Sequence, residues 1–494
     1  MPLTSSGSLR FAVHAQPEFR PAVESMLRSL LPDVRFDGGR SIWVDVVLGK
    51  KGIAVTVALE GVDDTHHQTD EEIAVGSYLP GEWQRRAKER VRLGVFSLIS
   101  RTFELPRSPW GTLVGVRPTK LVHRLLDEGQ TPDSVMHQLS DLYAVSEDRL
   151  ALLLQVAQTQ RSFFRLTPGD PISVYIGIPF CPTRCRYCSF AAYPLATHGH
   201  LVEGFVRTLL AEIEMLGDVL CEGGISVESV YVGGGTPTAL QPEQLERVLE
   251  AVNRRLAAWA CPEFTVEAGR PETLTSSMVS VLRRTGVQKT CINPQSMQQS
   301  TLDAIGRAHR VGDVVDAFSR CRQAGITSIN SDVILGLPGE TLADVDSTLS
   351  QLCDLLPDAL TVHALARKRA ASWRSELAGL RIEHGQAQQM ADTAHSAAET
   401  LGMKPYYLYR QRFLFGDLEN VGYAREGHES LYNIQMMEER QTVVGLGAGA
   451  VTKCVTPDLV VSRIVNPKCP AAYAERMAAR IDQQRAGLRQ ALQV

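Results

Sequence analysis

Three closely spaced cysteines form a run that could hold a metal centre. Cys181, Cys185 and Cys188 are spaced C-x-x-x-C-x-x-C. Thiolates are the usual protein ligands of iron–sulfur clusters, and three of them can bind three irons of a four-iron cluster. The fourth iron then keeps an open position for an external ligand, as catalytic metal sites do. The spacing therefore predicts a 4Fe–4S cluster with chemistry at one iron.

Two other interpretations of the cysteines are weaker. A structural zinc site could take His198 or His200 as its fourth ligand, but the spacing is not a usual zinc spacing. A disulfide framework is disfavoured because the ten cysteines of the 494 residues mostly stand singly, as in a reduced protein. The remaining cysteines lack ligand spacing, and we expect each to be a small buried apolar residue. They are Cys221, Cys261, Cys291, Cys321, Cys353, Cys454 and Cys469.

Further candidate ligand-binding residues follow later strand-like segments. Gly233, Gly234, Gly235 and Thr236 form a turn in which a ligand could approach the backbone closely and bind its amides and carbonyls. Glu267 ends the next strand-like segment, where a carboxylate can accept hydrogen bonds from an ammonium group or a ribose. An ion pair between Glu267 and Arg270 is the alternative.

Three more polar residues extend this series. Gln295 and Arg307 follow the fourth strand-like segment, and Asp332 lies in the fifth. A guanidinium suits a carboxylate ligand, and an aspartate accepts well from ribose hydroxyls. Singly, each of these residues is more often a surface or capping residue.

The elements that must position these residues alternate between strand and helix from 172 to 362. The expected strands are 172–178, 229–232, 263–267, 289–292, 329–334 and 360–362. The helical patterns are 202–216, 241–257, 274–285 and 313–324. Six such units predict an α/β domain with a parallel sheet and right-handed crossovers. The cysteine run then lies in a loop at the carboxyl end of the first strand, where barrel enzymes place their chemistry.

Two further regions flank this domain. Residues 1–165 are expected to form an α/β domain, and residues 363–494 a third region. The first has strand patterns at 9–15 and 41–59, and a Gly-Lys-Lys-Gly turn divides the second of these. Its helical patterns are 82–101, 121–129 and 132–142. Proline-rich linkers are expected at 106–109 and 168–171. The third has an aromatic stretch at 405–409, a glycine-rich strand-like segment at 443–451 and a terminal helix.

Composition excludes several classes of protein. The formal net charge is −4, whereas a nucleic-acid-binding protein usually has a basic surplus or stripe. No run approaches the roughly eighteen apolar residues of a membrane helix. The N-terminus lacks the charged and apolar blocks of a signal peptide, so we expect a cytoplasmic protein without a membrane span.

The order of these motifs resembles the radical S-adenosylmethionine (SAM) superfamily, whose members bind SAM at the open iron and cleave it to a 5′-deoxyadenosyl radical. From the cysteine run through Leu-Pro-Gly-Glu at 337–340, the spacing is similar to that of the oxygen-independent coproporphyrinogen III dehydrogenases. This implies a partial (β/α)6 barrel with an N-terminal α/β domain and a C-terminal α+β extension. It also implies that the glycine motif binds the SAM amino group and that Tyr175 lies beside the cluster.

Residues outside the barrel resemble the HemZ-type branch of that family. The matching segments are 110–120, 406–411, 416–424 and 445–450. The resemblance implies decarboxylation of two propionates of coproporphyrinogen III to vinyl groups, giving protoporphyrinogen IX. It implies a 4Fe–4S cluster, one or two molecules of SAM, a low-potential donor such as flavodoxin or ferredoxin, and an electron acceptor.

The substrate of that reaction is a wide apolar disc with carboxylates at its rim. Its site should combine apolar walls with a few cationic anchors. Tyr406, Tyr407, Tyr409 and Arg410 are candidates, and core packing is the alternative for this aromatic run.

Two departures from the well-studied dehydrogenases leave other functions open. Those enzymes have a cysteine where this chain has Phe190, and a histidine where it has Gly177. A phenylalanine is typical of the heme-chaperone branch, so a heme-binding chaperone is one alternative. SAM-dependent methyl transfer to a tetrapyrrole, or opening of the heme ring, is another. Fold and cluster do not choose between these functions.

Overall fold

The computed structural model divides the chain into two compact units, Met1–Leu154 and Gln155–Val494. The described residues are 9–31, 33–49, 52–62, 65–70, 82–105, 107–113, 117–164, 171–256, 261–366, 384–411 and 414–492.

Some predicted features lie outside the described residues. They are the two lysines of the Gly-Lys-Lys-Gly turn, Pro106 in the first linker, 168–170 in the second linker, and 114–116 in the first branch-specific segment. The expected domain boundary at 165 also falls outside them. The separation of a third region at residue 363 stays a prediction.

The first unit is built on a sheet with the strand order β1-β2-β3-β4. The strands are β1 (Arg10–Ala15), β2 (Arg35–Gly49), β3 (Gly52–Leu59) and β4 (Thr65–Asp70). β1 and β2 are parallel, and the other neighbours are antiparallel. The expected strands at 9–15 and 41–59 are confirmed, although β2 begins earlier than its pattern indicates.

One hydrophobic core joins this sheet to α1 (Arg20–Leu30) and α2 (Glu82–Thr102). β3 contributes alternate side chains to the core, including Ile53, Val55 and Val57, because successive residues of a strand point to opposite faces. The helix expected at 82–101 is thereby confirmed.

Three helices follow: α3 (Thr119–Asp127), α4 (Pro132–Tyr143) and α5 (Glu147–Arg161). At the start of α4, the Ser134 amide donates to Thr131 Oγ1 at 3.3 Å, and a proline occupies the first turn. The helices expected at 121–129 and 132–142 are confirmed, whereas no sequence pattern predicted α5.

The second unit contains an eleven-stranded sheet whose central strands are parallel. Six of them follow one another in chain order and pair with their neighbours in parallel. They are β5 (Ile172–Ile178), β8 (Val227–Gly234), β9 (Glu263–Glu267), β10 (Lys289–Cys291), β11 (Ser328–Leu335) and β12 (Ala359–Ala364). These are the strands that the sequence predicts, and the α/β fold class is confirmed.

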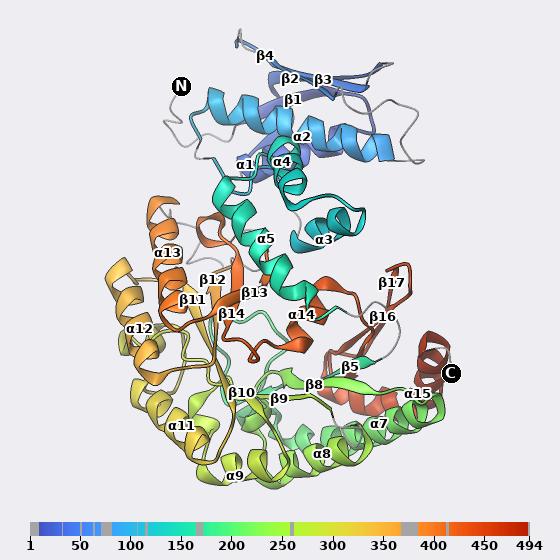
Figure 1. Cartoon of the computed structure of the whole chain (residues 1–494), viewed down its shortest axis with the longest axis vertical. Helices are drawn as coiled ribbons and strands as arrows, with labels where there is room; N and C mark the ends of the chain where they lie inside the picture. The colour runs from blue at the N-terminus through green and yellow to red at the C-terminus, as the bar shows by residue number, and fades with distance from the viewer. Residues whose placement is uncertain are drawn as a thin grey trace. The chain divides into compact units, whose positions relative to one another are not determined.

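Helices form an outer layer along this sheet (Figure 1). They are α7 (Val202–Gly223), α8 (Pro242–Arg255), α9 (Ser276–Arg284), α11 (Val311–Gln323) and α12 (Leu342–Leu355). In α8 the buried residues Leu245, Val248 and Val252 recur at helical spacing, so one stripe of the helix faces the core. The first four of these helices match their sequence patterns, and α12 is additional.

The C-terminal segments extend the sheet at both ends. β13 (Lys404–Tyr409) and β14 (Asn420–Ala424) continue it antiparallel beyond β12. β15 (Val443–Gly447) pairs in parallel with β5, and β16 (Val451–Val455) and β17 (Val461–Val465) follow it antiparallel. The aromatic stretch and the glycine-rich segment therefore belong to the same sheet as β5, the strand that precedes the cysteine loop.

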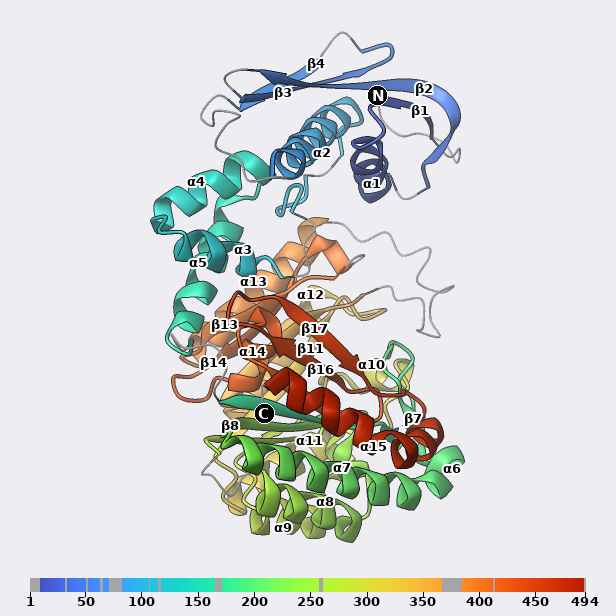
Figure 2. The ribbon, with the colours of Figure 1, turned by 90° about the vertical axis from the view of Figure 1, so that its right-hand side faces the viewer.

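The remaining elements are mostly short or C-terminal. They are β6 (Phe180–Cys181), β7 (Tyr193–Pro194), α6 (Leu195–His198), α10 (Gln299–Ala304), α13 (His384–Thr400), α14 (Leu431–Glu438) and α15 (Pro470–Leu492). α15 is the expected terminal helix, and it packs along α7 (Figure 2). Within the described residues, no helix has the length and apolarity needed to cross a membrane.

Candidate active site

A cavity of about 410 Å³ lies in the second unit against β8 to β13, with the cysteine loop in its wall. It brings together most of the residues that the sequence singles out. The predicted residues that line it are Cys181, Cys185, Cys188, Gly234, Gly235, Thr236, Glu267, Gln295, Arg307, Asp332, Tyr406, Tyr407 and Tyr409. Tyr175, Gly233 and Arg410 are not among its lining residues.

The cysteine loop leaves β5 as the sequence predicts and is held by backbone hydrogen bonds. The Arg186 amide donates to the Ile305 carbonyl at 3.0 Å, and the Cys188 amide donates to the Cys185 carbonyl at 3.1 Å. Cys181 is buried, and Cys185 and Cys188 are half-buried. The loop therefore presents three free thiols to one cavity.

The residues around these thiols fit an iron–sulfur cluster. A Cβ added at Gly235 would lie 3.0 Å from Cys181 Sγ and 2.5 Å from the Phe180 carbonyl oxygen, so glycine keeps this side of the loop clear. Burial raises the pKa of Cys181 to about 11, and a hydrogen bond from Thr236 partly opposes that shift. A thiol must lose its proton to bind metal, so cluster binding there would release a proton.

Cluster thiolates each bind a different iron and need not converge on one ion. Across the described part of the chain, no three His, Cys, Asp or Glu side chains are grouped as ligands of a single metal ion. The three loop cysteines, each able to bind a separate iron, are the residues that would hold a cluster.

The glycine segment at the end of β8 approaches two neighbouring segments closely. Gly234 has φ +118°, which favours glycine, and a Cβ there would lie 2.9 Å from the Ile178 carbonyl oxygen. A Cβ at Gly233 would lie 2.8 Å from a carboxyl oxygen of Glu267. Gly233 therefore leaves room for Glu267, while Gly234 and Gly235 line the cavity.

Glu267 ends β9 and is held by two hydrogen bonds. Tyr231 Oη donates to its carboxyl group at 2.6 Å, and the Gly234 amide donates at 3.3 Å. Burial raises the pKa of Glu267 to about 7, against the opposing effect of the Tyr231 hydrogen bond. The alternative pairing with Arg270 is wrong, because Arg270 forms its ion pair with Glu272 at 2.9 Å.

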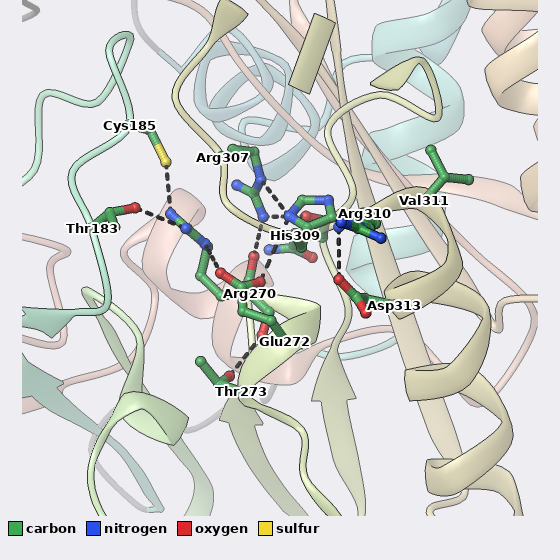
Figure 3. Close-up of polar contacts among 12 residues, drawn as sticks. Thr183, Cys185, Arg270, Glu272, Thr273, Arg307, His309, Arg310, Val311 and Asp313 are labelled. Carbon is green, nitrogen blue, oxygen red and sulfur yellow. Dashed lines mark hydrogen bonds and ion pairs between the residues drawn. The ribbon is translucent and has the colours of Figure 1, made fainter. Parts of the chain in front are cut away.

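Arg307 is buried, and its guanidinium donates to protein acceptors (Figure 3). Nη2 donates to the carbonyl oxygens of Gly269 at 2.5 Å and Asn293 at 2.6 Å. Nη1 donates to Tyr187 Oη at 3.0 Å. Arg307 thus ties together the loops that follow β9 and β10, a structural role that its position in the sequence does not reveal.

Gln295, in the loop after β10, and Asp332, within β11, are joined through their backbones. The Gln295 amide donates to the Asp332 carbonyl at 3.0 Å, and Gln295 has φ +69°, an uncommon value for a residue with a side chain. Gln295 Oε1 is buried without a protein hydrogen-bond partner. The Asp332 carboxylate accepts from Asn330 Nδ2 at 2.7 Å and lies 3.5 Å from His363 Nε2.

The tyrosines of β13 form another wall of the cavity. Tyr407 Oη donates to Thr361 Oγ1 at 3.3 Å, and Tyr409 Oη lies 3.2 Å from His363 Nδ1. Arg410 points elsewhere, because its Nη2 donates to Asp417 Oδ1 at 2.7 Å. The structure therefore places the three predicted tyrosines at the cavity but gives Arg410 a carboxylate partner away from its lining.

Tyr175 lies within a stack of aromatic rings rather than in the cavity lining. Its ring centroid is 5.7 Å from that of Tyr432 and 6.4 Å from that of Tyr231, with near-parallel planes. The predicted position of Tyr175 beside a cluster stays a prediction.

The two positions that depart from the well-studied dehydrogenases have different surroundings. Phe190 lines the cavity and is 67% exposed. A Cβ at Gly177 would lie 3.1 Å from the Ala448 carbonyl oxygen and 3.3 Å from the Tyr175 ring, so little room exists for a larger side chain.

Sequence patterns missed several residues of the cavity. Arg270, His363, Tyr231 and Tyr187 all line it. Only Arg270 had a visible signal, its position three residues after Glu267. The expectation that the other cysteines are buried is wrong for Cys221 and Cys469, which are exposed, and Cys261 and Cys353 are only half-buried. Cys291, Cys321 and Cys454 are buried as expected.

Known proteins show clear similarity to this chain. The sequence matches the Radical SAM superfamily over residues 175–352. It is 38% identical over 374 residues to the oxygen-independent coproporphyrinogen-III oxidase-like protein HemZ of Bacillus subtilis (strain 168), covering 74% of each chain. It is 29% identical over 282 residues to the heme chaperone HemW of the same bacterium, covering 56% of this chain and 70% of that protein.

A solved structure shares the fold. Coproporphyrinogen III oxidase (HemN) from Escherichia coli, described as a radical SAM enzyme, matches with a TM-score of 0.52 at 21% identity. The match covers 67% of this chain and 73% of that chain.

Proposed function

The chain belongs to the oxygen-independent coproporphyrinogen III oxidase family of radical SAM proteins, and we propose that it converts coproporphyrinogen III to protoporphyrinogen IX. In this reaction two propionate side chains each lose a β-hydrogen, carbon dioxide and one further electron, and become vinyl groups. A 4Fe–4S cluster and SAM, when bound, supply the 5′-deoxyadenosyl radical that removes each hydrogen.

The observation that carries the proposal is that the cysteine loop and the β13 tyrosines line one cavity. Cys181, Cys185 and Cys188 would hold the cluster. The tyrosine wall is suited to the apolar face of a tetrapyrrole, as ligand pockets generally combine aromatic walls with a few polar groups. The chain's task is then to bind and orient the propionate and to exclude water.

The residues proposed to bind SAM surround the cysteine loop. The amides of Gly234 and Gly235 already donate to Glu267 and to the Ile178 carbonyl, so the carbonyls of this glycine segment are proposed to accept from the SAM amino group. The Glu267 carboxylate can accept from its ammonium or ribose. Asp332 can accept from ribose hydroxyls, and Gln295 has an unpaired buried oxygen to offer. A low-potential electron donor such as flavodoxin or ferredoxin, and a separate electron acceptor, complete the proposed reaction in the cytoplasm.

Product analysis tests the proposal directly. Anaerobically reconstituted protein is incubated with SAM, a low-potential reductant, an electron acceptor and coproporphyrinogen III. We expect mono- and divinyl products, with two 5′-deoxyadenosines formed per protoporphyrinogen because two propionates each lose one hydrogen. Competent SAM cleavage without vinyl products would contradict the decarboxylase assignment.

A heme-binding chaperone is the second candidate function. Phe190 is exposed in the cavity wall, and the heme chaperone HemW is among the relatives of this chain. Tight heme binding without porphyrinogen turnover would assign the protein to that function. Loss of heme absorption with release of iron would instead indicate ring opening, and methylated products would indicate methyl transfer.

A further inference from the structure

Arg270 is a buried arginine that directly contacts a proposed cluster ligand. Its Nη1 donates to Cys185 Sγ at 3.2 Å, and its side chain is 3% exposed. We propose that Arg270 is a positioning residue that orients Cys185 and raises the reduction potential of the cluster. This proposal rests on the cluster binding that the proposed function requires, but not on the identity of the substrate.

The guanidinium of Arg270 is held on three sides (Figure 3). Nε donates to Glu272 Oε1 at 2.9 Å, and Nη2 donates to Thr183 Oγ1 at 2.9 Å. Thr183 and Cys185 are in the same loop, two residues apart. Arg270 therefore spans this part of the cysteine loop, while Glu272 fixes the plane of the guanidinium from the opposite side. A flexible lysine has one nitrogen and could not reproduce this geometry.

The buried side chains around Cys185 carry more positive than negative charge, which favours an anion at this position. Two arginines, Arg270 and Arg307, are buried there, and Glu272 is the carboxylate that pairs with one of them. His309 lies between Glu272 and Arg307, with Nδ1 3.7 Å from Glu272 Oε2 and 3.4 Å from Arg307 Nε.

His309 does not change this balance. Burial lowers its pKa to about 3, and both arginines add to that effect, so the ring is neutral at physiological pH. The Tyr187 hydroxyl accepts a hydrogen bond from Arg307 Nη1 at 3.0 Å. A buried positive charge is costly unless an anion compensates it. A cluster held by thiolates supplies that anion at Cys185.

The direction of the effect follows from electrostatics. Adding an electron makes a thiolate-bound cluster more negative. A fixed cation that donates a hydrogen bond to a ligand sulfur stabilises the reduced form more than the oxidised form. Removing the cation should therefore make reduction less favourable. Arg270 also lines the cavity, so binding the carboxylate of SAM is the competing role.

Potentiometry on the reconstituted protein separates these roles. The cluster is assembled anaerobically in four proteins: wild type, Arg270→Gln, Arg270→Lys and Thr183→Val. Iron and sulfide are measured in each. The cluster is then titrated with reductant in the absence of SAM, and its reduction is followed by electron paramagnetic resonance. We expect Arg270→Gln to disfavour reduction at least tenfold, a shift of about 59 mV to lower potential for one electron. Arg270→Lys should recover part of the shift.

The controls keep the result interpretable. Arg247→Gln removes one positive charge from an exposed residue that pairs with Glu203, so it should leave the potential unchanged. If Arg270→Gln does not fold, Thr183→Val tests the same contact, because it releases Nη2 and should shift the potential in the same direction by less. An assembled cluster with the wild-type potential in the Arg270 variants would overturn the proposal, even if SAM affinity fell. Failure of the wild type to assemble a cluster would instead contradict the cluster assignment itself.

Discussion

The hydroxyl of Tyr231 on β8 donates a 2.6 Å hydrogen bond to the carboxyl group of Glu267 at the end of β9, and both residues line the cavity. Burial nevertheless raises the pKa of Glu267 to about 7. Asp332 adds to this shift, while the Gly234 amide and His363 oppose it. Glu267 is thus poised between its neutral and charged forms near physiological pH.

This balance predicts that SAM binding depends on pH. Only the charged carboxylate can pair with the SAM ammonium, so below pH 7 binding must release a proton from Glu267. We expect SAM affinity to rise up to about tenfold per pH unit below the pKa and to level off above it. Equilibrium binding of SAM to the reconstituted protein between pH 5.5 and 8.5 measures this.

Two variants serve as controls for the dependence of SAM affinity on pH. Glu267→Gln should weaken binding and flatten the profile. Tyr231→Phe removes a hydrogen bond that lowers the Glu267 pKa, so it should move the rise to higher pH. A profile that is unchanged in both variants would show that Glu267 does not contact SAM.

The cysteine loop gives the second prediction. Replacing Cys181, Cys185 or Cys188 by alanine should abolish cluster absorption and SAM cleavage together, because each thiolate would bind its own iron. Cys221→Ala is the matched control, since Cys221 is exposed and distant in sequence from the loop. Iron and sulfide analysis after anaerobic reconstitution measures the outcome. Full iron and sulfide in a triple variant would refute the assignment.

Arg307 gives a prediction that differs from its expected role at the SAM carboxylate. Its guanidinium donates to the Gly269 and Asn293 carbonyls, so Arg307→Ala should leave buried acceptors unpaired at a cost of about 1–3 kcal/mol each. We expect the apparent thermal midpoint to fall by several degrees. Arg254→Ala, at an exposed residue paired with Glu214, is the control and should have almost no effect.

Asp332→Asn separates binding from stability in the same experiment. Asp332 is half-buried at the cavity. The variant should weaken SAM affinity by about ten- to hundredfold, the cost of one charged hydrogen bond, and should change the thermal midpoint less than Arg307→Ala does. If Arg307→Ala binds SAM weakly but keeps the wild-type stability, the role of Arg307 would instead be to bind the SAM carboxylate, as the sequence indicates.

The parallel strands could be predicted from sequence because their signal is local. β5 is an apolar, β-branched run that ends at the cysteine loop, and burial of the whole strand explains that composition. The glycines after β8 could also be predicted, since ligands and neighbouring backbones both require them. Side-chain partners could not, because they depend on loops brought together by the fold. Arg270 pairs with Glu272 rather than Glu267, and Arg410 pairs with Asp417 rather than facing the cavity.

Glu212 shows the same limit and gives the last prediction. It lies on α7, fully buried, and its carboxylate accepts hydrogen bonds from segments far along the chain. The donors are the Gly447 amide at 2.7 Å, Asn466 Nδ2 at 2.9 Å, Tyr473 Oη at 2.6 Å and Gln484 Nε2 at 2.6 Å. Burial raises the pKa of Glu212, although all four donors oppose that shift. One carboxylate therefore anchors β15 and α15 to α7.

Glu212→Ala should leave these donors without an acceptor and destabilise the second unit by about 3 kcal/mol or more, with α15 the first element to be released. Limited proteolysis should then cut within α15 in the variant and not in the wild type, and the thermal midpoint should fall. Glu222→Ala is the matched control: Glu222 is also on α7 and binds Arg489 of α15 at 2.5 Å, but that ion pair is exposed. An exposed pair contributes about 0–1 kcal/mol, so the control should keep α15 protected. Equal protection of α15 in both variants would mean that apolar packing against α7, and not the buried carboxylate, holds the C-terminal helix.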